Sequence, residues 1–345
     1  MLIRLVKMFN ESPLVSICIP TYNRAGMVNR AIESALAQSY KHIEVLVVDN
    51  ASDDDIESVI ATYHDPRLKF FKNDRNIGLF GNFNRCVELA KGEYVHILHS
   101  DDSLDSDFTQ TCVKFLNANP TVVMTFTSVQ AISDVEHVSI GSLKQDHVFF
   151  APEGFKEILK IRNLVSCPSV MIRKEIYKIV GLYSLEFPYS GDLYQWLKIA
   201  KRFDIAYVSG TTLFYQQGTH SESFQLLFKT PIGYIDTLKI FVRVVDELGD
   251  DLELYYPELN CAFRRHMRDC LFAGIARSET MIKYSSPMFI GFALSTWGLV
   301  VPTSFSDKMK KFSEFLLIFL IGCAIILPGG RYCVRKIFGF SPEKY

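Results

Sequence analysis

Residues 14–54 read LVSICIPTYNRAGMVNRAIESALAQSYKHIEVLVVDNASDD, and this stretch decides the fold. It opens with a β-rich apolar run at residues 14–20, continues with apolar residues at helical spacing over 27–39, and closes with a second β-rich run at 43–49. A strand, a helix and a strand in this order are typical of a parallel sheet covered by helices. We therefore predict an α/β fold with a mostly parallel sheet flanked by helices.

The alternation of strand and helix patterns continues beyond this stretch. Residues 68–71 and 94–98 are further β-rich runs, separated by a helical pattern that ends at Gly92. Beyond residue 151 the pattern changes, and we predict helices at 152–163 and 191–203, a strand at 169–175, an extended segment at 204–217 and amphipathic helices over 224–283.

Polar side chains follow three of the predicted strands. The sequences are PTYNR after the first strand, DNASDD after the second and HSDD after the fourth. Ligands of open α/β sheets bind outside the carboxyl ends of the strands, so these three segments predict a site. A nicotinamide cofactor is disfavoured, because no glycine-rich loop follows the first strand.

Asp101 and Asp102 are adjacent carboxylates that repel each other and lose hydration if they are buried, so a positive group is expected beside them. A divalent cation with hard oxygen ligands, Mg²⁺ or Mn²⁺, would remove the repulsion. The alternative is that both residues cap the next helix.

Composition excludes some partners. The net charge is −1, and no basic stripe interleaved with aromatic residues suggests a nucleic-acid partner. The eight cysteines are scattered and are interpreted as reduced thiols. The first 13 residues lack a long apolar core and make a poor secretory signal, so we expect a cytoplasmic enzyme.

The C-terminal region is apolar and basic. Residues 284–306 carry no charge, and residues 315–327 are almost wholly apolar but shorter than the ~20 residues that span a bilayer. From residue 302 onward the sequence contains seven basic residues and three acidic ones. We expect peripheral or monotopic association with the inner face of the plasma membrane. The alternative is a pair of buried helices.

Three segments together resemble family 2 glycosyltransferases with the GT-A fold, over roughly residues 14–220. They are residues 15–54, quoted above, NDRNIGLFGNFNRCVELAKGEYVHILHSDDSL at 73–104, and GLYSLEFPYSGDLYQWLKIA at 181–200. The resemblance implies transfer of a sugar, with inversion, from a nucleotide diphosphate to an acceptor hydroxyl, with a divalent metal.

The resemblance also implies residues that bind the nucleotide sugar. Asp49 matches a carboxylate that accepts a hydrogen bond from uracil, Asp53 assists nearby, and Arg75 matches a basic residue near the base and phosphates. The loop that holds the nucleoside base corresponds to Pro20, Thr21, Tyr22 and Asn23.

For the metal, Asp101 and Asp102 match aspartates that contact ribose and cation. Many relatives have an Asp where this chain has His99, so the register is open: we favour Asp102 as metal ligand and Asp101 near the ribose, with Asp101 as the alternative ligand. His99 could contact the nucleotide or simply pack at the strand end. His220 matches a histidine that completes the metal site from a loop, although a loop histidine can be incidental.

For catalysis, Asp192 at a predicted helix start matches the general base of the family, with a helix cap as the alternative. The acceptor is expected to be a saccharide or a lipid-linked saccharide used in cell-surface polysaccharide synthesis. Two rival functions are a sugar nucleotidyltransferase and a non-catalytic membrane component of a polysaccharide assembly complex.

We expect an N-terminal extension at residues 1–13 and a GT-A catalytic domain at 14–222, followed by a helical region at 223–284 and a membrane-associating region at 285–345. Within the catalytic domain, residues 14–110 form the half that binds the nucleotide sugar and residues 150–222 the acceptor half.

Overall fold

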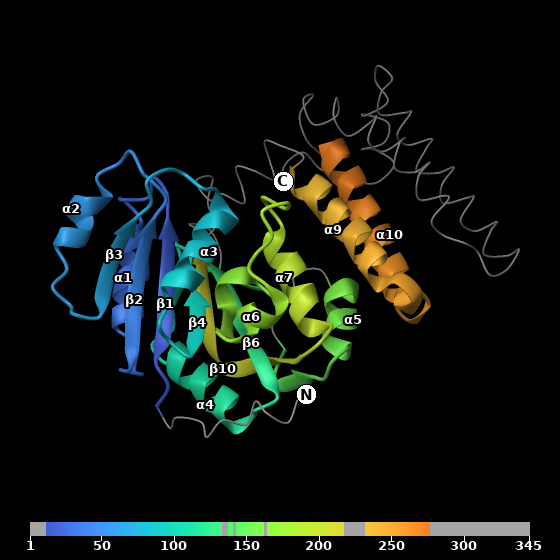
Figure 1. The fold of residues 1–345 in the computed structure, drawn as a ribbon, viewed down its shortest axis with the longest axis horizontal. Coiled ribbons are helices and arrows are strands. Elements are labelled where there is room, and N and C mark those ends of the chain that lie inside the picture. The colour runs from blue at the N-terminus through green and yellow to red at the C-terminus, as the bar shows by residue number, and fades with distance from the viewer. Residues whose placement is uncertain (1–11, 133–136, 141–142, 162–163, 217–231, 277–345) are drawn as a thin grey trace, which may run out of the picture. The chain divides into compact units, whose positions relative to one another are not determined.

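A computed structural model describes residues 12–132, 137–140, 143–161, 164–216 and 232–276 of the chain (Figure 1). Its centre is one sheet whose strands follow the order β3-β2-β1-β4-β9-β6-β10-β5, with β7 paired to β6 and β8 paired to β10. The predicted α/β class is therefore confirmed.

The N-terminal part of the sheet is parallel, as the alternation of strands and helices predicts. Strand β1 pairs with β2 and with β4, and β2 pairs with β3, all in parallel. Every residue of β1 and β2 is buried, which explains their nearly continuous apolar sequence. The elements are β1 (Val15–Thr21), α1 (Val28–Leu36), β2 (Ile43–Asp49), α2 (Ile56–Ala61), β3 (Leu68–Lys72), α3 (Leu79–Leu89) and β4 (Tyr94–Ile97).

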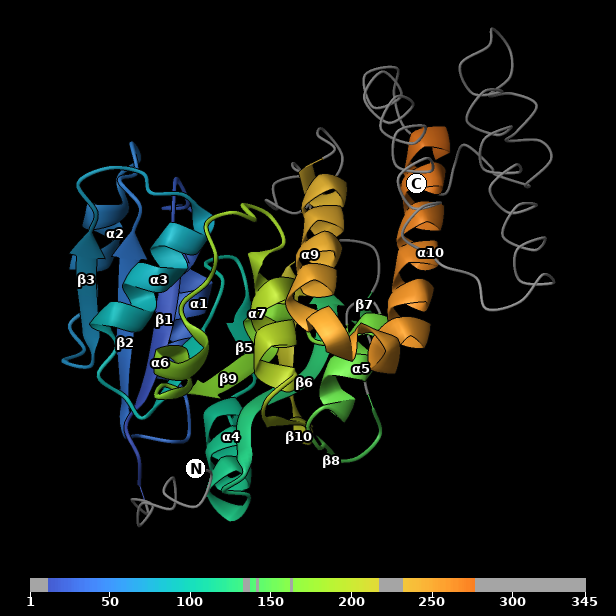
Figure 2. The ribbon, with the colours of Figure 1, turned by 45° about the vertical axis from the view of Figure 1, so that its right-hand side comes forward.

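Helices cover both faces of these strands, because successive strand residues point to opposite sides. On one face, Ile17 and Val47 pack in the same core as Ile32 of α1 and Ile56 of α2. On the other face lies α3, where the thiol of Cys18 donates a hydrogen bond to the carbonyl of Cys86 (3.7 Å). Figure 2 shows α3 lying across β2 and β1.

Beyond β4 the sheet becomes mixed. Strand β9 runs antiparallel to both β4 and β6, and β10 runs parallel to β6. In the sheet, β9 and β6 lie between β4 and β10. The last residue of β10 is Gln216. The elements are β5 (Ser103–Leu104), α4 (Phe108–Ala118), β6 (Val122–Ile132), β7 (His137–Ile140), β8 (His147–Phe149), α5 (Glu153–Lys160), a 3-10 turn η2 (Cys167–Ser169), β9 (Val170–Arg173), α6 (Ile176–Val180), α7 (Gly191–Ala200) and β10 (Asp204–Gln216).

Two compact units divide the chain. The first comprises residues 1–221 and 243–259, and the second comprises residues 222–242 and 260–345. Helices α9 (Ile232–Leu248) and α10 (Leu252–Ala276), joined by the 3-10 turn η3 (Gly249–Asp251), contribute to both units. Within the second unit, the ring of Phe241 lies 5.2 Å from that of Phe263 and 5.8 Å from that of His266.

Among the described residues, none of the helices combines the length and apolar character needed to cross a bilayer. The predicted membrane-associating region at 285–345 lies outside the described residues, as does the predicted N-terminal extension apart from its last two residues.

Candidate functional site at the strand ends

The loops after β1, β2 and β4 contact one another directly. The backbone N–H of Asn23 donates to Oγ of Ser52 (2.8 Å), and the backbone N–H of Asp53 donates to Oδ1 of Asn23 (2.9 Å). Nη1 of Arg24 lies 3.7 Å from Oδ2 of Asp101. The three loops therefore lie together at one edge of the sheet.

Asp102 is a fully buried carboxylate, with 0% of its surface exposed. Its Oδ1 accepts a hydrogen bond from the backbone N–H of Gln216 (2.9 Å), whereas its Oδ2 has no hydrogen-bond partner among the described residues. Burial, and then the charge of Asp101, raise the pKa of Asp102 well above its ordinary value. A buried oxygen of this kind is suited to binding a cation.

Asp101 is paired with arginines. Besides the contact with Arg24, Nη2 of Arg30 donates to the backbone carbonyl of Asp101 (2.5 Å). Both arginines come from the loop and helix that follow β1. The two guanidinium groups bring positive charge close to the carboxylate pair. Arg24 forms its ion pair with Asp101, so Oδ2 of Asp102 stays without a hydrogen-bond partner among the described residues.

His99, Asp101 and Asp102 form a group that could hold a metal ion. One ligand atom from each residue lies within 4.8 Å of the other two, and Nδ1 of His99 is 3.6 Å from Oδ2 of Asp102. Carboxylate oxygens are ligands of both Mg²⁺ and Mn²⁺, and an imidazole nitrogen is a ligand of transition-metal ions. Because the open oxygen of Asp102 faces this group, the residues fit the divalent cation that the resemblance implies.

Asp49 is fully buried at the end of β2 and is hydrogen-bonded within its own turn. Ser52 donates its hydroxyl to Oδ1 of Asp49, and its backbone N–H lies 3.1 Å from Oδ2 and 3.3 Å from Oδ1. Since Ser52 also accepts from Asn23, Asp49 holds the turn on which the loop after β1 rests. Asp53 is exposed in the same turn.

The first predicted loop contains buried and exposed members. Pro20 and Thr21 are buried at the end of β1, whereas Tyr22 is 43% exposed. Asn23 (φ 52°) and, in the turn after β2, Ala51 (φ 60°) adopt left-handed backbone conformations that are unusual for residues other than glycine. Strained backbone of this kind concentrates at functional sites.

Arg75 is exposed on the loop between β3 and α3, and Asn50 holds that loop. Asn50 is 4% exposed, and its side chain uses both donor hydrogens and both acceptor sites in hydrogen bonds of 2.9–3.3 Å. Its partners are the side chains of Asn73 and Asn76, the backbone N–H of Ile77 and the carbonyl of Gly78.

Asp192 lies in the first turn of α7. Burial raises its pKa to about 6, although the backbone N–H of Leu193 donates to Oδ1 (2.8 Å) and opposes this shift. The preceding Gly191 leaves room for the ring of Phe80, because a Cβ at that position would lie 2.8 Å from the ring. The helix start is thereby packed against α3.

Cys167 lies in η2, near both Asp192 and Asp102. Burial raises the pKa of the Cys167 thiol well above its usual range, and the charges of Asp192 and Asp102 add to this effect. Trp196, one turn beyond Asp192, is 2% exposed and packs against Tyr183 with ring centroids 6.1 Å apart. The structure therefore places Trp196 in the core.

His220 lies outside the described residues. Gln216, four positions earlier, is the last described residue before it and donates to Asp102.

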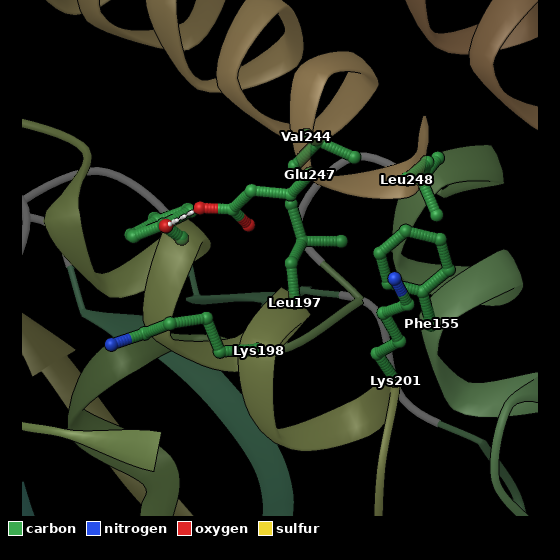
Figure 3. A pocket seen from close by; sticks show the side chains of 8 residues that line it. Phe155, Leu197, Lys198, Lys201, Val244, Glu247 and Leu248 are labelled. Carbon is green, nitrogen blue, oxygen red and sulfur yellow. Dashed lines mark hydrogen bonds between the residues drawn. The ribbon is translucent and has the colours of Figure 1, made fainter. Parts of the chain in front are cut away.

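A separate hollow is lined by residues of α5, α7 and the part of α9 from Arg243 onward (Figure 3). The hydroxyl of Tyr194 donates to Oε1 of Glu247, and Nζ of Lys198 donates to the carbonyls of Val180 (2.9 Å) and Leu182 (3.2 Å). None of the residues lining this hollow belongs to the strand-end loops. Its lining is Phe155, Tyr194, Leu197, Lys198, Lys201, Val244, Glu247 and Leu248.

Comparison with known proteins identifies the family. Residues 16–180 match the sequence model described as Glycosyl transferase family 2. The chain is 30% identical over 193 residues to the UDP-Glc:alpha-D-GlcNAc-diphosphoundecaprenol beta-1,3-glucosyltransferase WfaP of Escherichia coli, covering 55% of this chain and 71% of WfaP. The chain belongs to glycosyl transferase family 2.

Other relatives match over different shares of their length. The putative teichuronic acid biosynthesis glycosyltransferase TuaG of Bacillus subtilis is 27% identical over 203 residues, which are 58% of this chain and 77% of TuaG. For five further curated relatives, the match covers only 38–61% of the relative's own length.

Solved structures confirm the GT-A type of fold. The crystal structure of S. aureus TarS 1-349 in complex with UDP-GlcNAc has a TM-score of 0.59 to this chain at 16% identity, covering 93% of this chain and 87% of TarS 1-349. At this level of identity the likeness concerns the fold.

Sequence reasoning missed four residues that build the site: Arg24, Arg30, Asn50 and Cys167. Arg24 belongs to the PTYNR segment, and the expected positive group beside the carboxylate pair was a signal that could have pointed to it. Asn50 and Cys167 carry no local signal, because their roles depend on partners distant in sequence.

Proposed function

We propose that this chain is a metal-dependent, inverting glycosyltransferase that moves a sugar from a UDP-sugar to a hydroxyl of a saccharide or lipid-linked saccharide. The observation that carries the proposal is the buried, open Oδ2 of Asp102 at the point where the three strand-end loops meet. Family membership, the name of WfaP and the UDP-GlcNAc complex of TarS support the donor class.

In this proposal the strand-end loops bind the nucleotide. The segment from Pro20 to Asn23 lies against the base, with Asp49 and Asp53 shaping or contacting its pocket, and Arg75 lies near the phosphates. Asp101 is assigned to the ribose. Asp102, with Asp101 as a second candidate and His220 from the following loop, would hold Mg²⁺ or Mn²⁺, which when bound offsets charge on the leaving diphosphate.

Asp192 is assigned as the general base. Its carboxylate accepts the proton of the acceptor hydroxyl while that oxygen forms a bond to the anomeric carbon and the bond from this carbon to the diphosphate oxygen breaks. With a pKa of about 6, Asp192 is mostly ionised at pH 7 and remains basic enough to accept a proton. Burial raises the pKa of Cys167 and of Tyr183, and the charge of Asp192 adds a smaller effect to each, so both side chains lie near this base.

Membrane association belongs to the proposal through the acceptor. WfaP is named for a diphosphoundecaprenol-linked acceptor, and a lipid-linked acceptor would place this enzyme at the cytoplasmic face of the membrane. The apolar, basic residues 285–345 are the segment proposed to contact that surface.

The test is donor turnover with purified protein, UDP-glucose or UDP-GlcNAc, and Mn²⁺. We expect metal-dependent release of UDP, abolished by EDTA, and its loss in Asp192→Asn with unchanged UDP binding. Formation of pyrophosphate from UTP and a sugar phosphate would instead indicate a nucleotidyltransferase. Absence of both turnover and metal-dependent UDP binding would indicate a non-catalytic component.

A further inference from the structure

The position of His99 bears on which metal the site takes. Its backbone carbonyl accepts from the backbone N–H of Asp102 (3.1 Å), which closes a tight turn over residues 99–102. This turn brings the imidazole and the Asp102 carboxylate to the same side. Adjacent ligands of an octahedral ion with bonds of ~2.1 Å are about 3.0 Å apart, so the observed 3.6 Å needs a shift of only about half an ångström.

An independent observation points to a cation at this place. Oδ2 of Asp102 is fully buried and lacks a hydrogen-bond partner in the described part of the chain, while Gln216 fixes Oδ1 and so orients the carboxylate. At 3.6 Å, Nδ1 of His99 is too distant to hydrogen-bond to this oxygen. Both atoms are of a kind that can bind a metal ion, and they face each other.

The His99 ring is held in place and remains accessible. Its centroid lies 5.9 Å from that of Phe83 on α3, and its side chain is 29% exposed. Asp101, the third member of the group, is engaged by Arg24 at 3.7 Å. The imidazole is therefore better placed than Asp101 to share a cation with Asp102.

We propose that Nδ1 of His99 is a direct ligand of the metal held by Asp102, and that this chain consequently prefers Mn²⁺ to Mg²⁺. The inference rests on the metal site of the proposed function and adds a nitrogen ligand to it. Mn²⁺, as a transition-metal ion, accepts an imidazole nitrogen more readily than Mg²⁺, which favours oxygen ligands in near-ideal octahedral geometry. A nitrogen ligand therefore makes the affinities for Mn²⁺ and Mg²⁺ differ more than they would in a site with oxygen ligands alone.

The direct test is electron spin-echo envelope modulation of Mn²⁺ bound to the full chain with UDP, which detects a coordinated ¹⁴N nucleus. Because His220 is a second candidate imidazole, the comparison uses His220→Gln as background. We expect ¹⁴N modulation in His220→Gln and its loss in His99→Gln/His220→Gln. His64→Gln, at an exposed histidine far along the chain from the turn, is the control and should match wild type.

Calorimetry supplies a second readout. We expect the ratio of Mn²⁺ to Mg²⁺ affinity to fall about tenfold in His99→Asp, which keeps a ligand but makes it an oxygen. Mn²⁺ binding without ¹⁴N modulation in His220→Gln would overturn the role of His99 and leave the proposed function standing. Failure of the wild-type chain to bind Mn²⁺ with UDP would overturn both.

Discussion

The backbone N–H of Gln216 donates a 2.9 Å hydrogen bond to Oδ1 of Asp102, across 114 positions of sequence. It ties the end of β10 to the carboxylate beyond β4 and leaves Oδ2 of Asp102 as the open atom of the site. One oxygen of Asp102 therefore serves the fold and the other is available to a ligand.

Asp102→Asn separates these two roles, because an amide keeps an acceptor for Gln216 but loses the negative charge. At metal concentrations a hundredfold above the dissociation constant, Mn²⁺ with UDP should stabilise wild type by about 2.7 kcal/mol. We expect almost no stabilisation in the variant. Thermal unfolding with and without Mn²⁺ measures this, and an undiminished Mn²⁺ effect would remove Asp102 from the metal site.

Asp192 gives a pH-dependent prediction. A carboxyl with a pKa of about 6 is ionised in roughly one molecule in ten at pH 5, so the turnover number should fall about tenfold from pH 7 to pH 5. Asp192→Asn should lose transfer at every pH while UDP affinity stays unchanged. A flat wild-type profile of the turnover number would contradict the base assignment.

The same residue should affect stability. A folded-state pKa raised above the unfolded value of about 4 means that the folded state binds the proton more tightly, so stability falls as pH rises from about 4 to about 6. Asp192→Asn removes this loss and should stabilise the protein by on the order of 2 kcal/mol at pH 7. Urea unfolding of both proteins at pH 4 and pH 7 measures the difference, which should be smaller at pH 4.

Arg24 should act in opposite directions on the metal and on the nucleotide. Its guanidinium offsets the charge of Asp101, so Arg24→Gln should strengthen binding of Mn²⁺ alone and weaken binding of UDP with Mn²⁺, each by about tenfold or less. Arg85→Gln, at an arginine paired with Glu88 on the surface of α3, is the matched control. Equal effects of the two variants would show that Arg24 contributes only general charge.

Asn50→Ala tests the support of the Arg75 loop. The change removes the four hydrogen bonds of the buried Asn50 side chain, and we expect a loss of about 2–4 kcal/mol in the free energy of unfolding. UDP affinity should fall with it, measured by calorimetry at a temperature where the variant is folded. The control is Asn84→Ala on α3, which removes two hydrogen bonds between the Asn84 side chain and the backbone of Tyr183. It should lower stability without lowering UDP affinity.

Much of the fold could be predicted because it depends on local patterns. The β-rich runs and helical spacings of residues 14–104 give β1 to β4 and their helices, and the segments at 152–163, 169–175, 191–203 and 204–217 contain α5, β9, α7 and β10. Strands β5 to β8 went unpredicted. The place of β9 between β4 and β6 could not be derived, since antiparallel pairing across about 80 residues leaves no periodic signal.

The site was predictable as a meeting of strand ends, but the partners within it were not. The sequence shows that Asp49 and Asn50 lie at the end of a strand. It does not show that Ser52 hydrogen-bonds to the carboxylate of Asp49, or that the loop at residues 73–78 supplies the hydrogen-bond partners of Asn50. These hydrogen bonds depend on backbone geometry, including the left-handed Ala51. The roles of the individual site residues therefore remain predictions to be tested by substitution.

A crystal structure of the full chain with UDP and Mn²⁺, with anomalous scattering data, tests the central claim most directly. The account predicts one manganese peak within about 2.2 Å of Oδ2 of Asp102 and of diphosphate oxygens, with the uracil in the loops after β1 and β2. Manganese or UDP bound elsewhere, with Oδ2 of Asp102 left uncoordinated, would contradict it.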